Sequence, residues 1–365
     1  MASKSKLSVA GFFAGAGGLD LGFKNAGFSV PYANEYDKSI WLTYEHNFPK
    51  TKLDRRSIVD ISSEDIPNVT GYVGGPPCQS WSEAGAARGI NDHRGQLFFN
   101  YLDLIEANRP AFFMAENVSG ILFSKHAKAF RKILGGFLNL GYNVSYGLVR
   151  ASNFGVPQDR DRVFIIGYRT DLGIIFNPPV QLESKPTLKD AIWDLRSGAL
   201  PAAGGETNGN KLKILNHEFM TGSFSTIFMS RNRVRSWDEP SFTIQAGARH
   251  APLHPQAPKM IHVGKDLFEF KKGSEDLYRR LSIREAARVQ TFPDDFEFKY
   301  SRISDGYKMI GNAVPVKLAE VFAKTLKKDL EVIEIPNRRK LQKGELFTFT
   351  ELQEDQQLLP ISVSA

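Results

Sequence analysis

FFAGAGGLDLGF at residues 12–23 is the most informative stretch for the fold, because it joins the end of an apolar strand to the start of a helix. Gly15, Gly17 and Gly18 make a tight turn there, and glycines let backbone N–H groups approach a ligand at a helix start. The spacing differs from the GxGxxG of dinucleotide-binding enzymes. By itself the turn is as consistent with a plain strand–helix connection as with a ligand site.

Two short segments with acidic residues follow the turn, at positions where they could bind a nucleoside. An acidic residue about 20 residues beyond such a turn usually holds a ribose hydroxyl, and Glu35 in NEYD (34–37) fits that position. VDI at 59–61 could flank an adenine ring. Taken with the glycine turn, these segments favour a cofactor that contains adenosine.

Short apolar runs alternate with longer amphipathic stretches from the start of the chain to about residue 178. The strand-like runs are LSVAGFF, GFSVPYA, GYVGG, AFFMAEN, YNVSYGLV and RVFIIGY, and the helix-like stretches are SIWLTYEHNF, QLFFNYLDLIEANR and KAFRKILGGFLNLG. This alternation predicts an α/β fold, doubly wound, with a mostly parallel sheet and helices on both faces.

The character of the chain changes after about residue 178. Residues 198–210 are rich in Gly, Ala and Asn, as in a loop or exposed hairpin. Residues 211–265 hold eight Lys or Arg against three Asp or Glu, and the runs SFSTIFMSRNRVRSW and PSFTIQA favour strands by their aromatic and β-branched content. From about 277 the pattern is helical again, and the last thirty or so residues are mixed and polar. A second, smaller, β-rich unit is therefore expected between two parts of the first.

Bulk properties narrow the class of protein. The 365 residues carry a formal net charge of +7 with a pI of about 9.2, and excess positive charge favours a polyanionic partner. A single cysteine excludes an intramolecular disulfide and fits a reducing compartment. MASKSKLSVAGFF lacks the pattern of a signal peptide, and no apolar stretch is long enough to span a membrane. We therefore expect a soluble cytoplasmic protein.

The only thiol lies in GGPPCQSWSEAG at 74–85, after a Gly-Gly-Pro-Pro turn at the end of a predicted strand. A lone cysteine is more often a buried structural residue. Such residues normally lie in apolar periodic segments, whereas polar side chains follow Cys78 directly. A rigid proline that anchors a nucleophile beside a glycine-rich loop suits covalent catalysis, so Cys78 is predicted to be a nucleophile.

Two further segments carry charge at strand ends. MAENVSG at 114–120 closes an apolar strand with Glu116, which alone is more simply a helix cap but opposite a thiol can exchange a proton near neutral pH. QDRDRVFIIG at 158–167 places Arg160 and Arg162 on one face of a strand start. Alternate arginines usually mark a solvated edge, yet these precede an apolar strand, so at least one is expected to point at the site.

Six motifs occur in a single order: FFAGAGGLDLGF, GGPPCQS, ENV, QDRDRVF, RRLSIREAARVQTFPDDF and GYKMIGNAVPV. In this order they resemble the motif series of the bacterial cytosine carbon-5 DNA methyltransferases, over roughly residues 7–330. Several rare motifs in one order are far more specific than any one of them. Within that family, STIFMSRNRVRSW and LHPQAP resemble the HaeIII type, which acts on the palindrome GGCC.

The resemblance gives each segment an expected identity. Residues 1–178 become a catalytic and cofactor-binding domain with the S-adenosylmethionine-dependent methyltransferase fold, 179–276 a target-recognition domain, 277–330 the return to the catalytic domain, and 331–365 a tail of unknown role. Because the family-like motifs end before it, the tail beyond about residue 335 is expected to be dispensable for catalysis.

The resemblance also implies catalytic roles. The Cys78 thiolate would add to carbon 6 of cytosine, Glu116 would bind the ring N3, and Arg162 would hold the base and Glu116, with Arg160 in support. Charge that develops on the ring needs such stabilisation, and carbon 6 is reachable only after the base is flipped out.

S-adenosylmethionine is the methyl donor that the resemblance implies, with no metal. The residues implied to bind it are Phe13, Gly15, Gly17, Gly18, Glu35 on the ribose, Tyr36, Asp60 and Ile61 around the adenine, Pro77, Leu97, Asn312 and Val314. Tyr36 stands where some relatives carry Trp, which keeps a flat face for stacking.

Duplex DNA is the expected partner, with methylation of the inner cytosine of GGCC as the modification activity of a restriction–modification system. Arg231 and Arg233 alternate along a strand-like run and Arg249 follows a turn, so these three are expected to read guanines. Some of them could instead contact phosphates, as Lys211, Lys213 and Lys259 more plausibly do.

Two rival functions stay open: the same chemistry on RNA, and a catalytically silent DNA-binding regulator on the same fold. The basic insert favours DNA, and the combination of Cys78, Glu116 and Arg162 favours catalysis. A nicotinamide-dependent oxidoreductase is a distant third, because the glycine spacing is wrong. We expect a monomer without an obligate protein partner and without contact with a membrane.

Overall fold

Eight strands form one sheet at the centre of the larger lobe, in the order β14-β6-β8-β5-β4-β1-β2-β3. The computed structural model describes residues 7–77, 93–335 and 341–353, and this count refers to those residues. The strands are β1 Ser8–Phe12, β2 Ser29–Asn34, β3 Lys52–Asp54, β4 Gly71–Gly74, β5 Phe112–Val118, β6 Tyr142–Arg150, β8 Asp161–Arg169 and β14 Leu346–Thr348. β8 runs antiparallel to β5 and β6, and the other neighbours are parallel.

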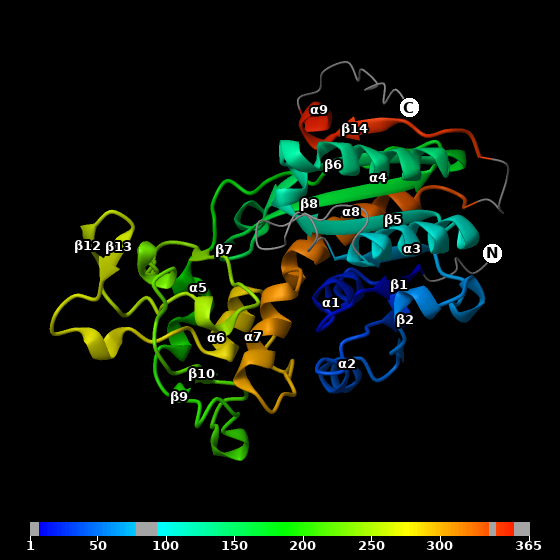
Figure 1. Ribbon diagram of the computed structural model, residues 1–365. Coiled ribbons are helices and arrows are strands. Elements are labelled where there is room, and N and C mark those ends of the chain that lie inside the picture. The colour runs from blue at the N-terminus through cyan, green and yellow to red at the C-terminus, as the bar shows by residue number, and fades with distance from the viewer. Residues whose placement is uncertain (1–6, 78–92, 336–340, 354–365) are drawn as a thin grey trace.

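Helices cover both faces of this sheet, so the predicted doubly wound α/β fold is confirmed (Figure 1). α3 (His93–Asn108) and α4 (Ala127–Asn139) pack on one face, and α1 (Gly18–Asn25) and α8 (Val316–Glu331) pack on the other. β5 shows why its sequence is apolar almost throughout: Phe113 faces the first helix layer and Phe112 the second.

Close approach of α1 to α8 depends on one glycine. A Cβ on Gly22 would lie 2.4 Å from the Cβ of Ala319, so any side chain there would push the helices apart. α8 presents Leu318, Phe322 and Leu326 to the sheet at intervals of four residues, which is the spacing of one helix face. The C-terminal helix of the predicted return segment is thus part of the sheet lobe.

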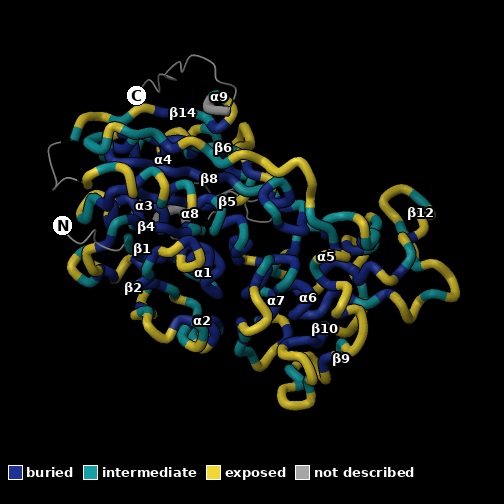
Figure 2. Tube along the Cα trace, turned by 180° about the vertical axis from the view of Figure 1, so that it is seen from behind, coloured by how far each residue is buried: buried dark blue, intermediate teal, exposed yellow. Residues whose placement is uncertain are grey.

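The smaller lobe is built mainly from loops and short elements: α5 Leu188–Ile192, α6 Ile283–Val289, and the short strands β9 Leu200–Pro201, β10 Glu218–Phe219, β11 Ser241–Phe242, β12 Ile261–Gly264 and β13 Leu267–Glu269. Figure 2 shows its outer loops, including the one at β12, largely exposed. The expectation of a long strand in SFSTIFMSRNRVRSW is wrong. That segment holds one 3-10 turn, Phe228–Ser230, and an isolated bridge at Val234.

Two elements join the lobes. β7 (Gln158–Asp159) leaves the sheet lobe and pairs in parallel with β11, and α7 (Ile303–Asn312) lies between the two lobes (Figure 1). A Cβ on Gly311 would lie 2.3 Å from the backbone of Gln245 and Ala246, so the end of α7 is in direct contact with the smaller lobe. No described helix is long and apolar enough to cross a membrane.

Residues 341–353 are an integral part of the sheet, which the sequence analysis did not foresee. β14 pairs in parallel with β6, and α9 (Phe349–Gln353) follows it directly. Leu346, Phe347 and Phe349 are buried, and the Phe349 ring lies 6.0 Å from that of Phe176. The tail as far as residue 353 therefore covers apolar surface of the larger lobe.

Candidate active site

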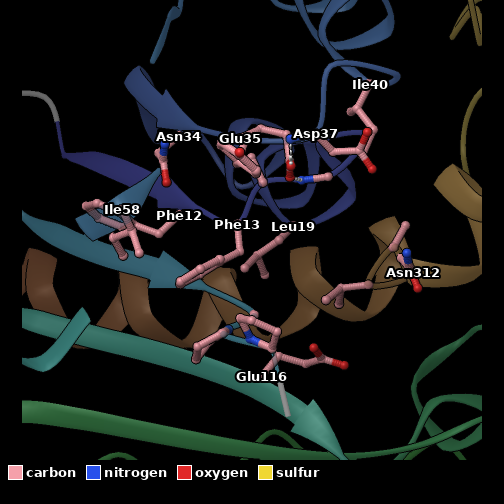
Figure 3. A pocket seen from close by; sticks show the side chains of 18 of the residues that line it. Phe12, Phe13, Leu19, Asn34, Glu35, Asp37, Ile40, Ile58, Glu116 and Asn312 are labelled. Atoms are coloured by element: carbon pink, nitrogen blue, oxygen red, sulfur yellow. Dashed lines mark hydrogen bonds between the residues drawn. The ribbon is translucent and has the colours of Figure 1, made fainter. Parts of the chain in front are cut away.

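A cavity of about 590 Å³ opens at the carboxyl ends of β1, β2, β4 and β5 (Figure 3). In open α/β sheets, ligands bind at this edge, where the strand order reverses. The lining residues come from the ends of β1, β2 and β5, from the segments that follow the strands, and from α1, α3 and the end of α7. They are Phe12, Phe13, Ala14, Gly15, Leu19, Asp20, Asn34, Glu35, Tyr36, Asp37, Ile40, Ser57, Ile58, Gly75, Pro76, Pro77, Leu97, Glu116, Asn117, Val118, Lys308, Asn312, Ala313 and Val314.

The glycine turn forms one wall of the cavity. Phe13, Gly15 and Gly17 all have positive φ, at 51°, 54° and 86°. A Cβ on Gly17 would lie 2.3 Å from the Phe48 ring, and one on Gly18 would lie 2.3 Å from the carbonyl oxygen of Val314. Gly17 and Gly18 thus allow close packing behind the turn, while Phe13 and Gly15 line the cavity itself.

Glu35 is fixed by the backbone on both sides. Its Oε2 accepts a hydrogen bond from the Gly15 N–H at 2.8 Å, and its Oε1 accepts one from the Asp37 N–H at 2.7 Å. Burial raises the pKa of Glu35, while these two hydrogen bonds work in the opposite direction. Each oxygen keeps a lone pair for a further donor, so the carboxylate can accept from ligand hydroxyls.

Tyr36 is the most exposed aromatic residue of the cavity wall, at 72%. Asp60 and Ile61, which the resemblance placed around the adenine, lie outside the lining: Asp60 is exposed and Ile61 is buried in the apolar core. Ser57 and Ile58, from the same segment, line the cavity instead. The segment thus reaches the cavity, but through different side chains from those expected, at the start of its short 3-10 turn (Ile58–Asp60).

Glu116 and Arg162 form an ion pair at the far end of the cavity. Glu116 is in β5 and Arg162 in the adjacent, antiparallel β8, and the Arg162 Nε lies 2.8 Å from the Glu116 Oε1. Their side chains are 11% and 13% exposed. Burial lowers the pKa of Arg162, and the carboxylate of Glu116 opposes that shift. The pair can orient a planar, polar ring at this end of the cavity.

Arg160 makes different contacts from Arg162, the arginine that pairs with Glu116. The Arg160 guanidinium is buried and donates to the carbonyl oxygens of Ile244 at 2.9 Å, Gly311 at 2.8 Å and Ala313 at 3.1 Å. It therefore ties the smaller lobe to the chain on either side of Asn312. This role is one of positioning, since Arg160 is hydrogen-bonded away from Glu116.

Cys78 lies outside the described residues. The chain that leads to it is described as far as Pro77 and passes beside Glu116: a Cβ on Gly75 would lie 3.1 Å from the Glu116 Oε2. Asn117 also donates a hydrogen bond from Nδ2 to the Pro76 carbonyl oxygen at 3.1 Å. GGPPCQS and ENV, distant in sequence, thus lie side by side at their described ends.

Sequence reasoning missed three charged residues of the lining, Asp20, Asp37 and Lys308. Asp20 is fully buried, and burial raises its pKa to about 7 although Tyr44 donates a hydrogen bond to its Oδ2 at 2.6 Å. Lys308 forms an ion pair with Asp37. A signal for Lys308 was present, because it precedes Asn312 by four residues on a helix and so shares its face.

The three candidate recognition arginines do not behave alike. Arg231 and Arg249 are exposed, whereas Arg233 is buried. Arg233 donates from Nε to the Phe228 carbonyl oxygen and from a terminal nitrogen to that of Ile227, both at 2.8 Å. Because the segment is not a strand, Arg231 and Arg233 do not face the same side. Arg233 stabilises the loop and is not available to a base.

Comparisons with known proteins agree with this geometry. A family profile described as C-5 cytosine-specific DNA methylase matches residues 7–328. The Type II methyltransferase M.MthTI of Methanothermobacter thermautotrophicus is 54% identical over 325 residues, which are 89% of this chain and 98% of the relative. M.FnuDI of Fusobacterium nucleatum, also a Type II methyltransferase, is 52% identical over 328 residues, with coverage of 89% and 95%. A crystal structure of an E. coli prophage protein, assigned as a DNA modification methyltransferase, superposes with a TM-score of 0.67 at 25% identity, covering 89% of this chain and 100% of that one.

Proposed function

Because the chain belongs to the C-5 cytosine-specific DNA methylase family, we propose that this DNA (cytosine-5-)-methyltransferase methylates the inner cytosine of GGCC in duplex DNA, after that base is flipped out. Two relatives with more than half of their residues identical are Type II methyltransferases, so we assign the chain the modification role in a restriction–modification system. The Glu116–Arg162 pair, 2.8 Å apart at one end of the cavity, is the observation that carries the chemistry.

Each catalytic residue has one task in this proposal. The Cys78 thiolate forms a bond to carbon 6 of the cytosine, and the Glu116 carboxyl group gives its proton to N3, so that the negative charge pushed onto the ring is neutralised there. Arg162 fixes the Glu116 carboxylate and the ring edge. After carbon 5 has gained the methyl group, a water molecule takes the carbon 5 proton, and the electron pair of that bond restores the double bond between carbons 5 and 6. The bond between sulfur and carbon 6 then breaks, which frees the thiolate, and the N3 proton returns to Glu116. Arg160 supports the site indirectly, because its hydrogen bonds to the backbone on either side of Asn312 hold that segment in place.

The cavity suits S-adenosylmethionine in size and chemistry. Ligand sites of this kind typically measure about 300–1,000 Å³, and the cavity of about 590 Å³ lies within that range. When bound, this cofactor supplies an electrophilic methyl group on a sulfonium sulfur. Glu35 would hold the ribose, Tyr36 and Ile58 would flank the adenine, and Asn312 and Val314 would close the end nearest Glu116.

Recognition of GGCC falls to the smaller lobe in this proposal. Arg231 and Arg249 are exposed there and can each pair with O6 and N7 of a guanine in the major groove. The proposal rests on the resemblance of 223–258 to HaeIII-type enzymes and on these two side chains. The enzyme would act as a cytoplasmic monomer, with its single cysteine kept reduced.

Methyl incorporation from labelled S-adenosylmethionine tests the proposal directly. Duplexes with and without GGCC and a mixed tRNA sample are incubated with the protein, and methylated positions are mapped. We expect label at carbon 5 of the inner cytosine of GGCC alone. Label in tRNA but not in duplex DNA would establish the RNA alternative, and specific binding without any label would establish the silent regulator.

A further inference from the structure

The charges that line the cavity are unequal, and this imbalance points to a specific contact with the cofactor. Among the described lining residues, the acidic side chains are Asp20, Glu35, Asp37 and Glu116, and the single basic one is Lys308. S-adenosylmethionine has the opposite pattern at neutral pH: one carboxylate, one ammonium and one sulfonium. A buried or half-buried charge is stable only when it is paired, so the one anion of the ligand needs this one cation.

Lys308 also lies at the end of the cavity where the amino-acid part of the cofactor would lie. In the cofactor the amino-acid chain leaves the ribose on the side away from the adenine. Figure 3 shows Ile58 on one side of Glu35, and Asp37 and Asn312 on the other. Lys308 is one helical turn before Asn312 and is paired with Asp37, so it belongs to the second group.

The Lys308 ammonium group is held in place but keeps donors for a ligand. Its partner Asp37 is anchored by Ser39, which donates to Oδ1 from its N–H at 3.0 Å and from its hydroxyl at 2.7 Å. The Asp37 N–H is bound in turn to Glu35. A lysine ammonium has three donors, the described contact with Asp37 uses one of them, and the Lys308 side chain is 41% exposed.

We infer that Lys308 binds the α-carboxylate of S-adenosylmethionine, with Asp37 as the residue that positions it. This inference rests on the proposed function, and it goes beyond it by assigning the residue that recognises the amino-acid end of the cofactor. Since Asp37 follows the ribose-binding Glu35 by two residues, one loop then places both polar ends of the ligand.

Binding of two ligands that differ by one carboxylate tests the assignment. Calorimetry gives the Kd of S-adenosylhomocysteine and of its decarboxylated analogue, the aminopropyl thioether of adenosine. A hydrogen bond to a charged group corresponds to roughly 10–100-fold in Kd, so the unaltered protein should prefer S-adenosylhomocysteine by that factor. Lys308→Met should remove the preference by weakening S-adenosylhomocysteine alone, and Lys308→Arg should keep most of it.

Lys299→Met is the matched control, because Lys299 is also a half-exposed lysine in an ion pair, with Glu297, and lies outside this cavity. It should leave both Kd values unchanged. Equal weakening of both ligands by Lys308→Met would show that Lys308 only latches α7 to the loop at Asp37 and would overturn the inference. So would equal binding of both ligands by the unaltered protein, a result that does not depend on any variant. Failure of the unaltered protein to bind S-adenosylhomocysteine at all would instead overturn the proposed function.

Discussion

The two lobes satisfy their buried backbone groups in different ways. In the larger lobe, strands of up to nine residues pair in one sheet between apolar helix layers. In the smaller lobe, strands are two to four residues long, and buried arginines donate to loop carbonyls instead. Arg284 donates to the carbonyl oxygens of Leu215 at 2.9 Å, Pro293 at 3.1 Å and Phe296 at 2.9 Å. Positive charge in the smaller lobe is therefore partly structural.

This difference separates two uses of arginine that look alike in the sequence. Arg233, Arg280 and Arg284 are at most 7% exposed and serve the fold, whereas Arg231 and Arg249 are exposed and can meet DNA. The larger lobe, by contrast, uses the ion pair between Glu116 and Arg162, at one end of the cavity, for chemistry in our proposal. Substitutions in each lobe should thus change different measurements.

Glu116→Gln should give the largest effect. The amide cannot neutralise charge on the cytosine ring, so single-turnover methyl transfer should slow by about 10²–10⁴-fold, while DNA affinity stays within roughly threefold. Glu45→Gln is the control, because Glu45 is an ion-paired carboxylate of the same lobe on its surface. Unchanged transfer by Glu116→Gln would remove Glu116 from the mechanism.

Phe349→Ala should mainly change stability. Phe349 is 5% exposed and packs against Phe176 and Phe322, so its loss should lower the free energy of unfolding by about 3–5 kcal/mol. Urea titration measures this free energy, and the rate of methyl transfer by the folded protein should be unchanged. Removal of residues 341–365 should destabilise at least as much. A truncated enzyme of full stability would show that β14 and α9 do not support the larger lobe.

Arg284→Met should destabilise the smaller lobe by about 3 kcal/mol, since it removes a buried guanidinium and the donors that it supplies to the carbonyl oxygens of Leu215 and Phe296. The same change at exposed Arg231 should alter stability by less than about 0.5 kcal/mol. Equal effects of the two changes in urea titration would contradict the division between structural and exposed arginines.

Arg231→Ala should have the smallest effect in energy but a specific one. Loss of a contact to guanine should cost about 1–3 kcal/mol in binding to GGCC and relax the preference at one position. Lys211→Ala, a change at an exposed lysine, should weaken binding to all DNA sequences alike. It should also reduce the slope of log affinity against log salt concentration by about one unit. If Arg231→Ala weakened binding to GGCC and to unrelated duplexes equally, Arg231 would be excluded from base recognition.

The sequence predicted the larger lobe well because its signals are local and periodic. Runs such as AFFMAEN became β5, and Phe13, Gly15 and Glu35 line the cavity. It failed where side-chain contacts leave no periodic signal in the sequence: Arg160 reaches Ile244 and Gly311, and Arg233 folds back on its own loop. A three-residue strand such as β14 is too short to show a recognisable period. Its partner β6 also lies about two hundred residues earlier, so no local signal indicates the pairing.

Covalent trapping tests the central claim, attack by Cys78 on a cytosine held beside Glu116, most directly. A duplex carries 5-fluorocytosine at the inner position of GGCC and is incubated with S-adenosylmethionine. After methyl transfer, carbon 5 has fluorine where a proton should leave, so the bond between sulfur and carbon 6 cannot break. We predict a denaturant-stable protein–DNA complex with the unaltered enzyme and none with Cys78→Ala. Methylation of ordinary GGCC duplex without any trapped complex, or an equal yield of complex with Cys78→Ala, would contradict the account.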